Sequence, residues 1–229
     1  MSKPSIVRLE NVRKTYQMGS VPVEVLRGIT LEINSGEYVS IMGPSGCGKS
    51  TMLNLLGCLD QPTAGRYLLD EKDVSTLDDD SLSTIRGAKL GFIFQSYNLI
   101  QQLTVLENIE VPLYYQGRPE AESRDIAMEL AKIVGLEHRL HHKPRELSGG
   151  QQQRAGIARS LANDPLVLLA DEPTGNLDSS SGNDILKIFE DLHHRGKTII
   201  MVTHDPGIAE LTTRTIRLRD GQIENDVRR

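Results

Sequence analysis

A glycine-rich loop between an apolar run and an amphipathic run constrains this fold most. Residues 43–50 read Gly-Pro-Ser-Gly-Cys-Gly-Lys-Ser and fit the phosphate-loop pattern. Residues 37–42 are apolar and β-branched and predict a buried strand, and residues 49–56 place Leu and Met at helical spacing. A strand, a loop and a helix N-terminus form a phosphate cradle, because free backbone N–H groups and the helix dipole face the anion. The alternative is a glycine turn beside a surface lysine, and the matching flanks disfavour it.

Each residue type in this loop has its own task in holding a nucleoside triphosphate. Lys49 would reach the β- and γ-phosphates, Ser50 would bind Mg²⁺ and Thr51 could bond the α-phosphate. Glycines let the backbone approach the anion without a Cβ in the way. The sequence therefore predicts an ATP-binding loop made of Gly43, Ser45, Gly46, Cys47, Gly48, Lys49, Ser50 and Thr51.

Two adjacent carboxylates follow a second apolar run. Residues 165–170 predict a buried parallel strand, and Asp171 and Glu172 stand at its carboxyl end, where open α/β sheets bind ligands. Asp171 suits a magnesium shell, and Glu172 is the candidate to polarise a water for attack on the γ-phosphate. An acidic cap for the following helix is the alternative, and the presence of the phosphate loop makes it the less economical one.

A second glycine-rich helix start occurs at residues 147–151, Leu-Ser-Gly-Gly-Gln. Ser148 can cap a helix that runs from Gly149 to about Ala162 and buries Ile157, Ala158 and Leu161. Taken alone, it is more typical of a capped helix whose polar residues 151–153 lie on a solvated face. One nucleotide needs only one cradle, however, so we expect the second to serve a nucleotide held by another copy.

With these features in place, the chain resembles the nucleotide-binding subunits of ATP-binding cassette (ABC) proteins over essentially its whole length. The resemblance rests on residues 43–51, 147–154, 166–178 and 202–205, in the family's order and approximate spacing. It implies an α/β P-loop NTPase cassette with an antiparallel β subdomain and an inserted α-helical subdomain. It also implies a homodimer in the ATP state, with ATP between the phosphate loop of one copy and the 147–151 segment of the other.

The resemblance assigns further roles. Tyr16 would stack on adenine, Gln95 would contact Mg²⁺ and the attacking water, and His204 would contact the γ-phosphate and support Glu172. Taken alone, these three are typical of a packing residue, a surface residue and a turn residue. The implied catalytic set is Lys49, Gln95, Glu172 and His204, and the implied magnesium set is Ser50, Gln95 and Asp171. Residues acting in trans would be Ser148, Gly149, Gly150, Gln151 and Asp178, although Asp178 alone would also suit a cap for a helix over residues 179–194.

A narrower resemblance points to a subgroup. Residues 94–99, 147–154, 171–178 and 203–206 are similar to the lipoprotein-releasing (LolD-type) and macrolide-exporter (MacB-type) ATPases. In that subgroup the membrane partner is thought to transmit mechanical work rather than enclose a pore. An FtsE-type cell-division ATPase and a soluble ABC ATPase without a transporter are the alternatives. Cys47, where a serine is usual, departs from the subgroup pattern.

The net charge and the hydropathy of the chain limit the classes of partner that it can have. The net charge is −5 and the pI is near 5.7, which argues against nucleic acid as a partner. The sequence has neither a run of about 18 apolar residues nor a signal-peptide core. We therefore expect a cytoplasmic chain, peripheral on the cytoplasmic face of the inner membrane through an integral membrane permease subunit. The surface between Phe94 and about Leu106 is the expected docking site, with Tyr97 and Glu107 on its rim.

The organisation predicted along the chain is one domain, residues 1–229. Residues 1–96 and 163–229 would form the β subdomain and P-loop core, and residues 97–162 a helical subdomain that rotates when Gln95 senses the γ-phosphate. Residues 6–17 and 23–33 predict an antiparallel β region. Within the helical part, Pro112 marks a kink and Pro119 a helix start. Two apolar faces are expected there, one of Leu106, Ile109 and Leu113 and one of Ile126, Leu130 and Ile133.

Overall fold

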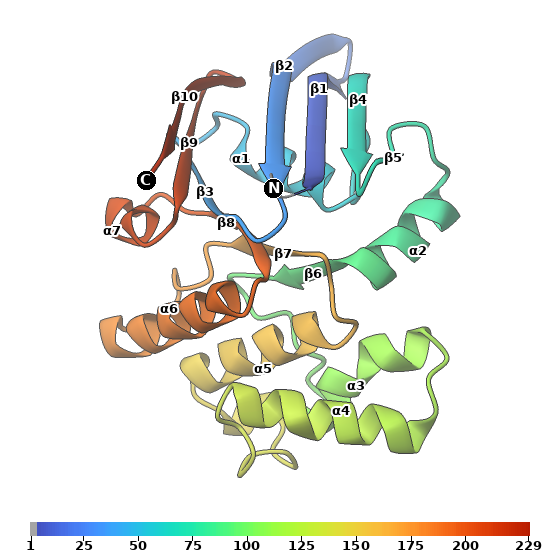
Figure 1. The fold of residues 1–229 in the computed structure, drawn as a ribbon, viewed down its shortest axis with the longest axis vertical. Helices are drawn as coiled ribbons and strands as arrows, with labels where there is room; N and C mark the ends of the chain where they lie inside the picture. The colour runs from blue at the N-terminus through green and yellow to red at the C-terminus, as the bar shows by residue number, and fades with distance from the viewer. Residues whose placement is uncertain (1–3) are drawn as a thin grey trace.

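The computed structural model describes residues 4–229, which form two sheets and a layer of helices (Figure 1). Residues 1–3 of the predicted domain lie outside the described residues. None of the helices within residues 4–229 has the length and apolar character needed to cross a bilayer.

An antiparallel sheet of four strands stands at the top of Figure 1, in the order β2-β1-β4-β5. It comprises β1 (Ser5–Met18), β2 (Val21–Asn34), β4 (Ala64–Leu69) and β5 (Lys72–Asp73). Strands β1 and β2 pair from Ser5 and Asn34 to Met18 and Val21. The predicted antiparallel region is confirmed, and the loop between its strands shortens to a tight turn in which Gly19 takes a φ of +64°.

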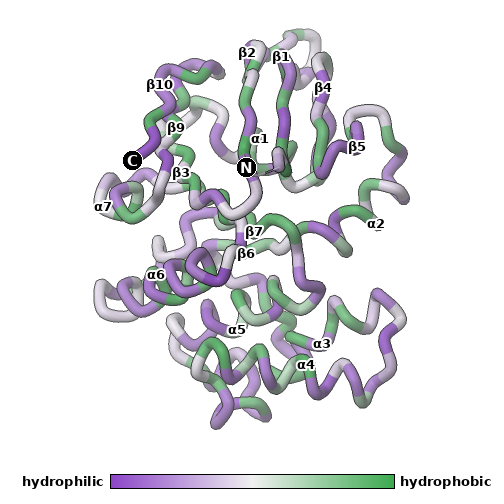
Figure 2. The backbone as a smooth tube through the Cα atoms, in the orientation of Figure 1, coloured by the Kyte–Doolittle hydropathy of each residue, from purple (hydrophilic) through white to green (hydrophobic). Residues whose placement is uncertain are grey.

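A second sheet of six strands crosses the middle of the molecule, in the order β10-β9-β3-β8-β7-β6. Its strands are β3 (Tyr38–Met42), β6 (Leu90–Ile93), β7 (Val167–Asp171), β8 (Thr198–Val202), β9 (Arg214–Arg219) and β10 (Gln222–Arg228). All but β10 run parallel, and every residue of β3 and β8 is buried. Continuous apolar runs suit these strands because both faces of the sheet are covered, as the central position of β6 and β7 in Figure 2 illustrates.

Seven α-helices and one 3₁₀ turn complete the described fold. They are α1 (Lys49–Leu56), α2 (Asp79–Lys89), α3 (Val105–Tyr115), α4 (Glu120–Ile133), the turn Pro144–Glu146, α5 (Gly149–Leu161), α6 (Ser179–His194) and α7 (Pro206–Glu210). Helices α3, α4 and α5 form the layer at the bottom of Figure 1. Pro112 lies inside α3, and Pro119 directly precedes α4, so the predicted helix start is confirmed.

The core divides into two clusters, one on each face of the parallel sheet. In β7, Val167 and Leu169 belong to the cluster shared with the antiparallel sheet, whereas Leu168 and Ala170 belong to the cluster shared with the helices. Successive strand residues point to opposite faces, so a single strand supports both clusters. The parallel sheet therefore lies between the antiparallel sheet and the helical layer and packs against both.

Two expectations about helix faces need correction. The most buried residues of α4 are Ser123, Ala127 and Ala131, whereas Ile133 of the predicted apolar face is 42% exposed. Small residues on the buried side let α4 lie close to its neighbour α3. On α5, the polar run is not a solvated face throughout, because Gln153 is fully buried and its Nε2 donates to the carbonyl of Pro173 at 2.6 Å.

Candidate functional site

The predicted catalytic residues follow strands whose carboxyl ends meet at one edge of the parallel sheet. Gly43 follows β3, Asp171 ends β7, and His204 follows β8. Gln95 comes shortly after β6, the neighbour of β7. Because these four strands run parallel, the fold brings together side chains that are far apart in the sequence.

The phosphate loop contains glycines at which a side chain would clash or be strained. A Cβ on Gly43 would lie 2.2 Å from the carbonyl oxygen of Leu218 and 2.6 Å from Sγ of Cys47. Gly48, with a φ of +105°, is the N-cap of α1 and gives that helix end no side-chain cap. The first N–H groups of α1 therefore face a cavity of about 190 Å³, lined by Val25, Gly46, Gly48, Lys49, Ser50 and Thr51.

Lys49 lies over this loop. Its Nζ donates to the carbonyl oxygens of Gly43 at 2.7 Å and Pro44 at 2.9 Å. Within residues 4–229 it forms no ion pair, so its charge is not neutralised by a carboxylate at hydrogen-bond distance. A phosphate would give this ammonium a charge-assisted bond in place of two neutral carbonyl contacts. The uncapped helix end, the glycine loop and the lysine together fit a bound phosphate chain.

Asp171 and Glu172 stand beside the loop. Burial raises the pKa of the Asp171 carboxyl, the charge of Glu172 raises it further, and the charge of Lys49 opposes both effects. A carboxylate whose ionised form is disfavoured by burial and by a neighbouring negative charge is suited to a divalent cation, which would relieve both costs. With the hydroxyl of Ser50 in the same loop, this donor set fits Mg²⁺.

Glu172 and His204 are in direct contact. Nδ1 of His204 lies 2.6 Å from Oε2 of Glu172, and the histidine side chain is 71% exposed while the glutamate is 22% exposed. Glu172 takes a left-handed φ of +43°, and its N–H donates to the carbonyl of Val202 in β8 at 3.0 Å. Such a conformation is costly for a non-glycine residue and is held here by the sheet edge. The fold therefore brings the sequence-predicted pair together.

Gln95 is tied to a residue that the sequence did not single out. Its Nε2 donates to Oδ1 of Asn176 at 3.2 Å, and Nδ2 of Asn176 donates to the backbone carbonyl of Gln95 at 3.1 Å. Asn176 lies between the end of β7 and the start of α6, in a stretch that carries the family resemblance but in which no role is predicted for Asn176 from the sequence. No sequence signal links two polar residues 81 positions apart.

Tyr16, the predicted adenine contact, is also fixed by partners that the sequence did not indicate. Its hydroxyl donates to Oδ2 of Asp60 at 2.7 Å, and Nζ of Lys14 lies 4.9 Å from its ring centroid. The same Nζ is 2.5 Å from Oδ1 of Asp60. This triad restrains the half-exposed ring on the sheet β2-β1-β4.

The second glycine-rich helix start has the predicted local structure. Oγ of Ser148 accepts from the N–H of Gln151 at 3.3 Å, and Oε1 of Gln151 accepts from the N–H of Ser148 at 3.0 Å, which forms a capping box. Ser148 is exposed, and its hydroxyl proton is not used by this cap. Beside it, Asp178 caps α6 by accepting from the N–H and Oγ of Ser181 at 3.0 and 2.7 Å.

The two glycine-rich helix starts are separate in this chain. Among the described residues, no hydrogen bond or ion pair joins residues 43–51 to residues 148–151. Helix α1 presents an uncapped end, whereas α5 presents a capped end with an exposed hydroxyl. Helix α1 packs in the core cluster shared with the antiparallel sheet and α5 in the cluster shared with the helices, so the two helices lie on opposite faces of the parallel sheet.

The family model described as ABC transporter matches residues 26–175. The chain belongs to the ABC transporter family. It is an ATPase cassette, and its relatives carry the same assignment. An uncharacterised ABC transporter ATP-binding protein of Thermotoga maritima is 53% identical over 98% of this chain and 96% of that protein. The macrolide export ATP-binding/permease protein MacB of Brucella melitensis is 54% identical over 99% of this cassette, which spans only 35% of that protein.

Solved structures agree with this assignment. The dimeric, post-hydrolysis structure of a Methanocaldococcus jannaschii ABC cassette, bound to ADP and phosphate, superposes with a TM-score of 0.89. It is 48% identical and covers 97% of this chain and 98% of that one. Another dimeric structure of the same cassette gives the same TM-score at 49% identity.

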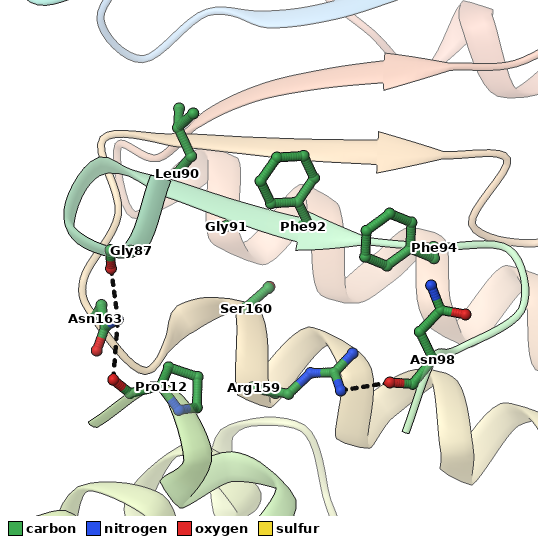
Figure 3. Close-up of a pocket in the computed structure, with 10 residues that line it drawn as sticks. All are labelled: Gly87, Leu90, Gly91, Phe92, Phe94, Asn98, Pro112, Arg159, Ser160 and Asn163. Carbon is green, nitrogen blue, oxygen red and sulfur yellow. Dashed lines mark hydrogen bonds between the residues drawn. The ribbon is translucent and has the colours of Figure 1, made fainter. Parts of the chain in front are cut away.

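The loop that follows β6 in this ABC cassette is clamped to the helical layer (Figure 3). The guanidinium of Arg159 on α5 donates to the carbonyls of Asn98 at 2.6 Å and Tyr97 at 3.0 Å, and burial lowers the pKa of Arg159. Tyr97 was predicted on the rim of a docking surface. Its hydroxyl lies 2.8 Å from where a Cβ on Gly149 would be, so the side chain packs against the start of α5, and its place on that rim stays a prediction.

Two adjoining cavities lie between this loop, α2 and α3. The first, of about 310 Å³, is drawn in Figure 3 and is lined by Phe92 and Phe94 of the β6 segment, Pro112 of α3 and Arg159 of α5. The second, of about 910 Å³, shares Gly87, Pro112 and Asn163 with it and extends to Tyr115. Together the two cavities form one groove beside α3. Tyr115 is 84% exposed and gives the ABC cassette an aromatic side chain at the edge of this groove.

Proposed function

We propose that two copies of this cassette close face to face around two molecules of Mg²⁺-ATP, and that each cycle drives a separate integral membrane permease subunit. The observation that carries the proposal is that the two glycine-rich helix starts belong to helices on opposite faces of the parallel sheet in one chain. A single triphosphate on Lys49 and the α1 end leaves the α5 end unused. A second copy, related by two-fold symmetry, would use both ends in both chains.

The capped end of α5 is suited to a γ-phosphate from outside the chain. The hydroxyl oxygen of Ser148 is already an acceptor for Gln151, so its proton is available to donate to an anion. The α5 dipole adds about half a positive charge at that end. Closure of two chains without a nucleotide would bring together two positive helix ends, and closure with ATP would neutralise them.

Each residue at the sheet edge has a separate role in the proposed hydrolysis of ATP. Bound Mg²⁺, held by Ser50, Gln95 and Asp171, would neutralise charge on the phosphate oxygens. Lys49 exchanges its loop carbonyls for the β- and γ-phosphates. Glu172 accepts the proton of the attacking water.

The imidazole of His204 donates from Nδ1 to the carboxylate of Glu172 and thereby fixes its direction. Its second ring nitrogen remains for the γ-phosphate. Hydrolysis removes the phosphate that bridges the two chains, and the pair opens.

The groove beside α3 is the proposed docking site of the permease subunit on the cytoplasmic face of the membrane. It combines exposed aromatic and apolar side chains with the loop after β6, which contains Gln95 and is clamped to α5 by Arg159. A helix of the permease seated there would contact both subdomains. The MacB relatives, whose names join ATP-binding and permease parts, support a partner of this kind. Lipoprotein release or macrolide-type export is the proposed work.

Affinity purification of the cassette from solubilised membranes of its own source, followed by mass spectrometric identification of the co-purified protein, tests this proposal. The expected partner has four membrane helices and a large extracytoplasmic domain. Tyr115→Asp, at the edge of the groove, should abolish co-purification, whereas Val227→Asp, on the exposed face of β10, should not. Recovery with no membrane protein, or equal loss with both variants, would contradict the proposed partner.

A further inference from the structure

The contact between Gln95 and Asn176 joins two segments that face different partners in the proposed cycle. Gln95 belongs to the loop that runs on to the docking groove, and Asn176 precedes Asp178, which would face the second copy. Their two hydrogen bonds, at 3.2 and 3.1 Å, link these segments across 81 positions of sequence.

The pair of hydrogen bonds fixes which way both carboxamides point. Nδ2 of Asn176 must face the backbone carbonyl of Gln95, because only the NH₂ group can donate to it. Oδ1 of Asn176 then faces the Gln95 side chain, which must present Nε2 to it. In the described part of the chain, Oε1 of Gln95 accepts no hydrogen bond, so the oxygen is left available while the nitrogen is held.

Steric contacts support the same orientation. A Cβ on Gly175 would lie 2.7 Å from Nε2 of Gln95, so a residue with a side chain at this position would displace the amide. Leu177 and Tyr97, the residues flanking the link on its two segments, both pack on Gly149, whose Cβ would lie 3.2 Å from Leu177 and 2.8 Å from the Tyr97 hydroxyl. The link and the start of α5 therefore form one junction.

We propose that Asn176 is a positioning residue for Gln95: it holds the carboxamide nitrogen so that Oε1 is presented to the metal ion. The inference rests on the proposed role of Gln95 as a metal contact. An outer partner that orients a metal ligand typically changes metal affinity by about 10- to 100-fold when it is removed. Asn176 has no direct contact with phosphate in this account, so its loss should leave nucleotide affinity without metal unchanged.

Two readouts that do not depend on turnover test the proposal. In nitrogen-15 NMR of the metal-free protein, Asn176→Ala should shift the side-chain amide signals of Gln95, assigned by their loss in Gln95→Ala. In electron paramagnetic resonance titrations of Mn²⁺ with β,γ-imido-ATP, Asn176→Ala should weaken Mn²⁺ binding about tenfold. Asn183→Ala, an exposed asparagine on α6, is the matched control and should do neither.

The double variant separates positioning from other effects. If Asn176 acts through Gln95, removing both should weaken Mn²⁺ binding no more than Gln95→Ala alone. Unshifted Gln95 signals in Asn176→Ala, or fully additive losses in the double variant, would overturn the proposal. A normal Mn²⁺ affinity in Gln95→Ala would instead refute the proposed metal role of Gln95 and, with it, the use that we assign to this link. Asn176→Asp, which keeps the acceptor and loses the donor, should shift the Gln95 signals if the alanine variant does not fold.

Discussion

Nδ1 of His204 lies 2.6 Å from Oε2 of Glu172 at the carboxyl ends of two adjacent parallel strands. The backbone of the two strand ends sets this contact, so the fold itself places the proposed base beside its orienting partner. The left-handed backbone of Glu172 and its bond to Val202 hold the carboxylate in this place. Binding of ATP and closure would then need to bring the substrate to the pair rather than assemble it.

Replacement of this carboxylate should separate binding from chemistry. Glu172→Gln keeps the side-chain volume but removes the proton acceptor, so turnover should fall at least about a hundredfold. ATP should still bind, and the pair of chains should persist because the bridging γ-phosphate is not removed. Phosphate release and size-exclusion chromatography with ATP measure both effects. Normal turnover by a monomeric variant would remove Glu172 from this role.

A bulky cation at the α5 end should block hydrolysis from the other side of the site. Ser148→Arg should abolish turnover while the affinity for ATP stays close to that of the wild type, because the phosphate loop of the same chain is intact. Equilibrium binding of a fluorescent ATP analogue measures that affinity. Loss of binding in this variant would mean that Ser148 acts within its own chain.

Mixing two inactive variants tests the same geometry. A chain with Ser148→Arg keeps Lys49, and a chain with Lys49→Ala keeps Ser148, so a mixed pair contains one complete site. An equal mixture should recover up to roughly a quarter of wild-type turnover if chains pair at random. Neither variant alone should be active, and a mixture as inactive as its components would contradict sites shared between chains.

The half-buried carboxyl of Asp171 should cost stability in the absence of metal. Burial, and then the charge of Glu172, raise the pKa of Asp171 above its unfolded value. Its ionised form is therefore disfavoured in the folded chain, and stability is lost as pH rises from the unfolded value through the raised folded value. Asp171→Asn should be more resistant to urea than the wild type at neutral pH without metal, and it should lose Mg²⁺-dependent turnover.

The same reasoning fixes the pH dependence of that difference. The gap in unfolding free energy between Asp171→Asn and the wild type should shrink as pH falls toward about 4, where the unfolded carboxyl also binds its proton. Urea titrations at several pH values measure it. A gap that is constant with pH, or a variant that is less stable at neutral pH, would contradict the assigned environment of Asp171.

Arg214 should be important for stability and not for nucleotide binding. It is 5% exposed, and its guanidinium donates twice to Asp226, at 2.8 and 2.7 Å, and once to Glu37 at 2.7 Å. Lysine keeps the charge but cannot reproduce the forked contact, so Arg214→Lys should lower the free energy of unfolding by about 2 kcal/mol. Arg217→Lys on the exposed side of β9 is the control, and urea unfolding measures both.

The contribution of Arg214 should disappear in acid. Its hydrogen bonds hold the pKa of Asp226 below the unfolded value. The stabilisation is therefore present above the unfolded pKa of about 3.9 and is lost as pH falls through the lower folded pKa. Equal stability of Arg214→Lys and wild type at neutral pH would show that the forked contact adds nothing.

The sequence predicts much of this fold because its local signals agree with one another. The phosphate loop, the strand before it and the helix after it appear as predicted, and so do Ser148 and Asp178 as helix caps. What it could not predict depends on contacts between distant segments. Three features each depend on a neighbour that only tertiary packing brings close. They are the burial of Gln153, the choice of the buried face of α4 and the Asn176–Gln95 link.

The roles in trans depend on a second chain and are the part that one sequence determines least. A capped helix end such as that of Ser148 has the same local structure whether or not it meets an ATP. The proposed role of this helix end in trans is inferred from the presence of one complete phosphate cradle elsewhere in the chain. That inference concerns the number of chains at a site, and it is open to a direct measurement.

The dependence of ATP turnover on protein concentration tests the central claim most directly. If each site is completed by two chains, turnover per chain should fall on dilution and become proportional to concentration once most chains are single. Ser148→Arg, measured in parallel, should be inactive at every concentration. A turnover per chain that stays constant on dilution, with light scattering showing only single chains in the presence of ATP, would contradict the account.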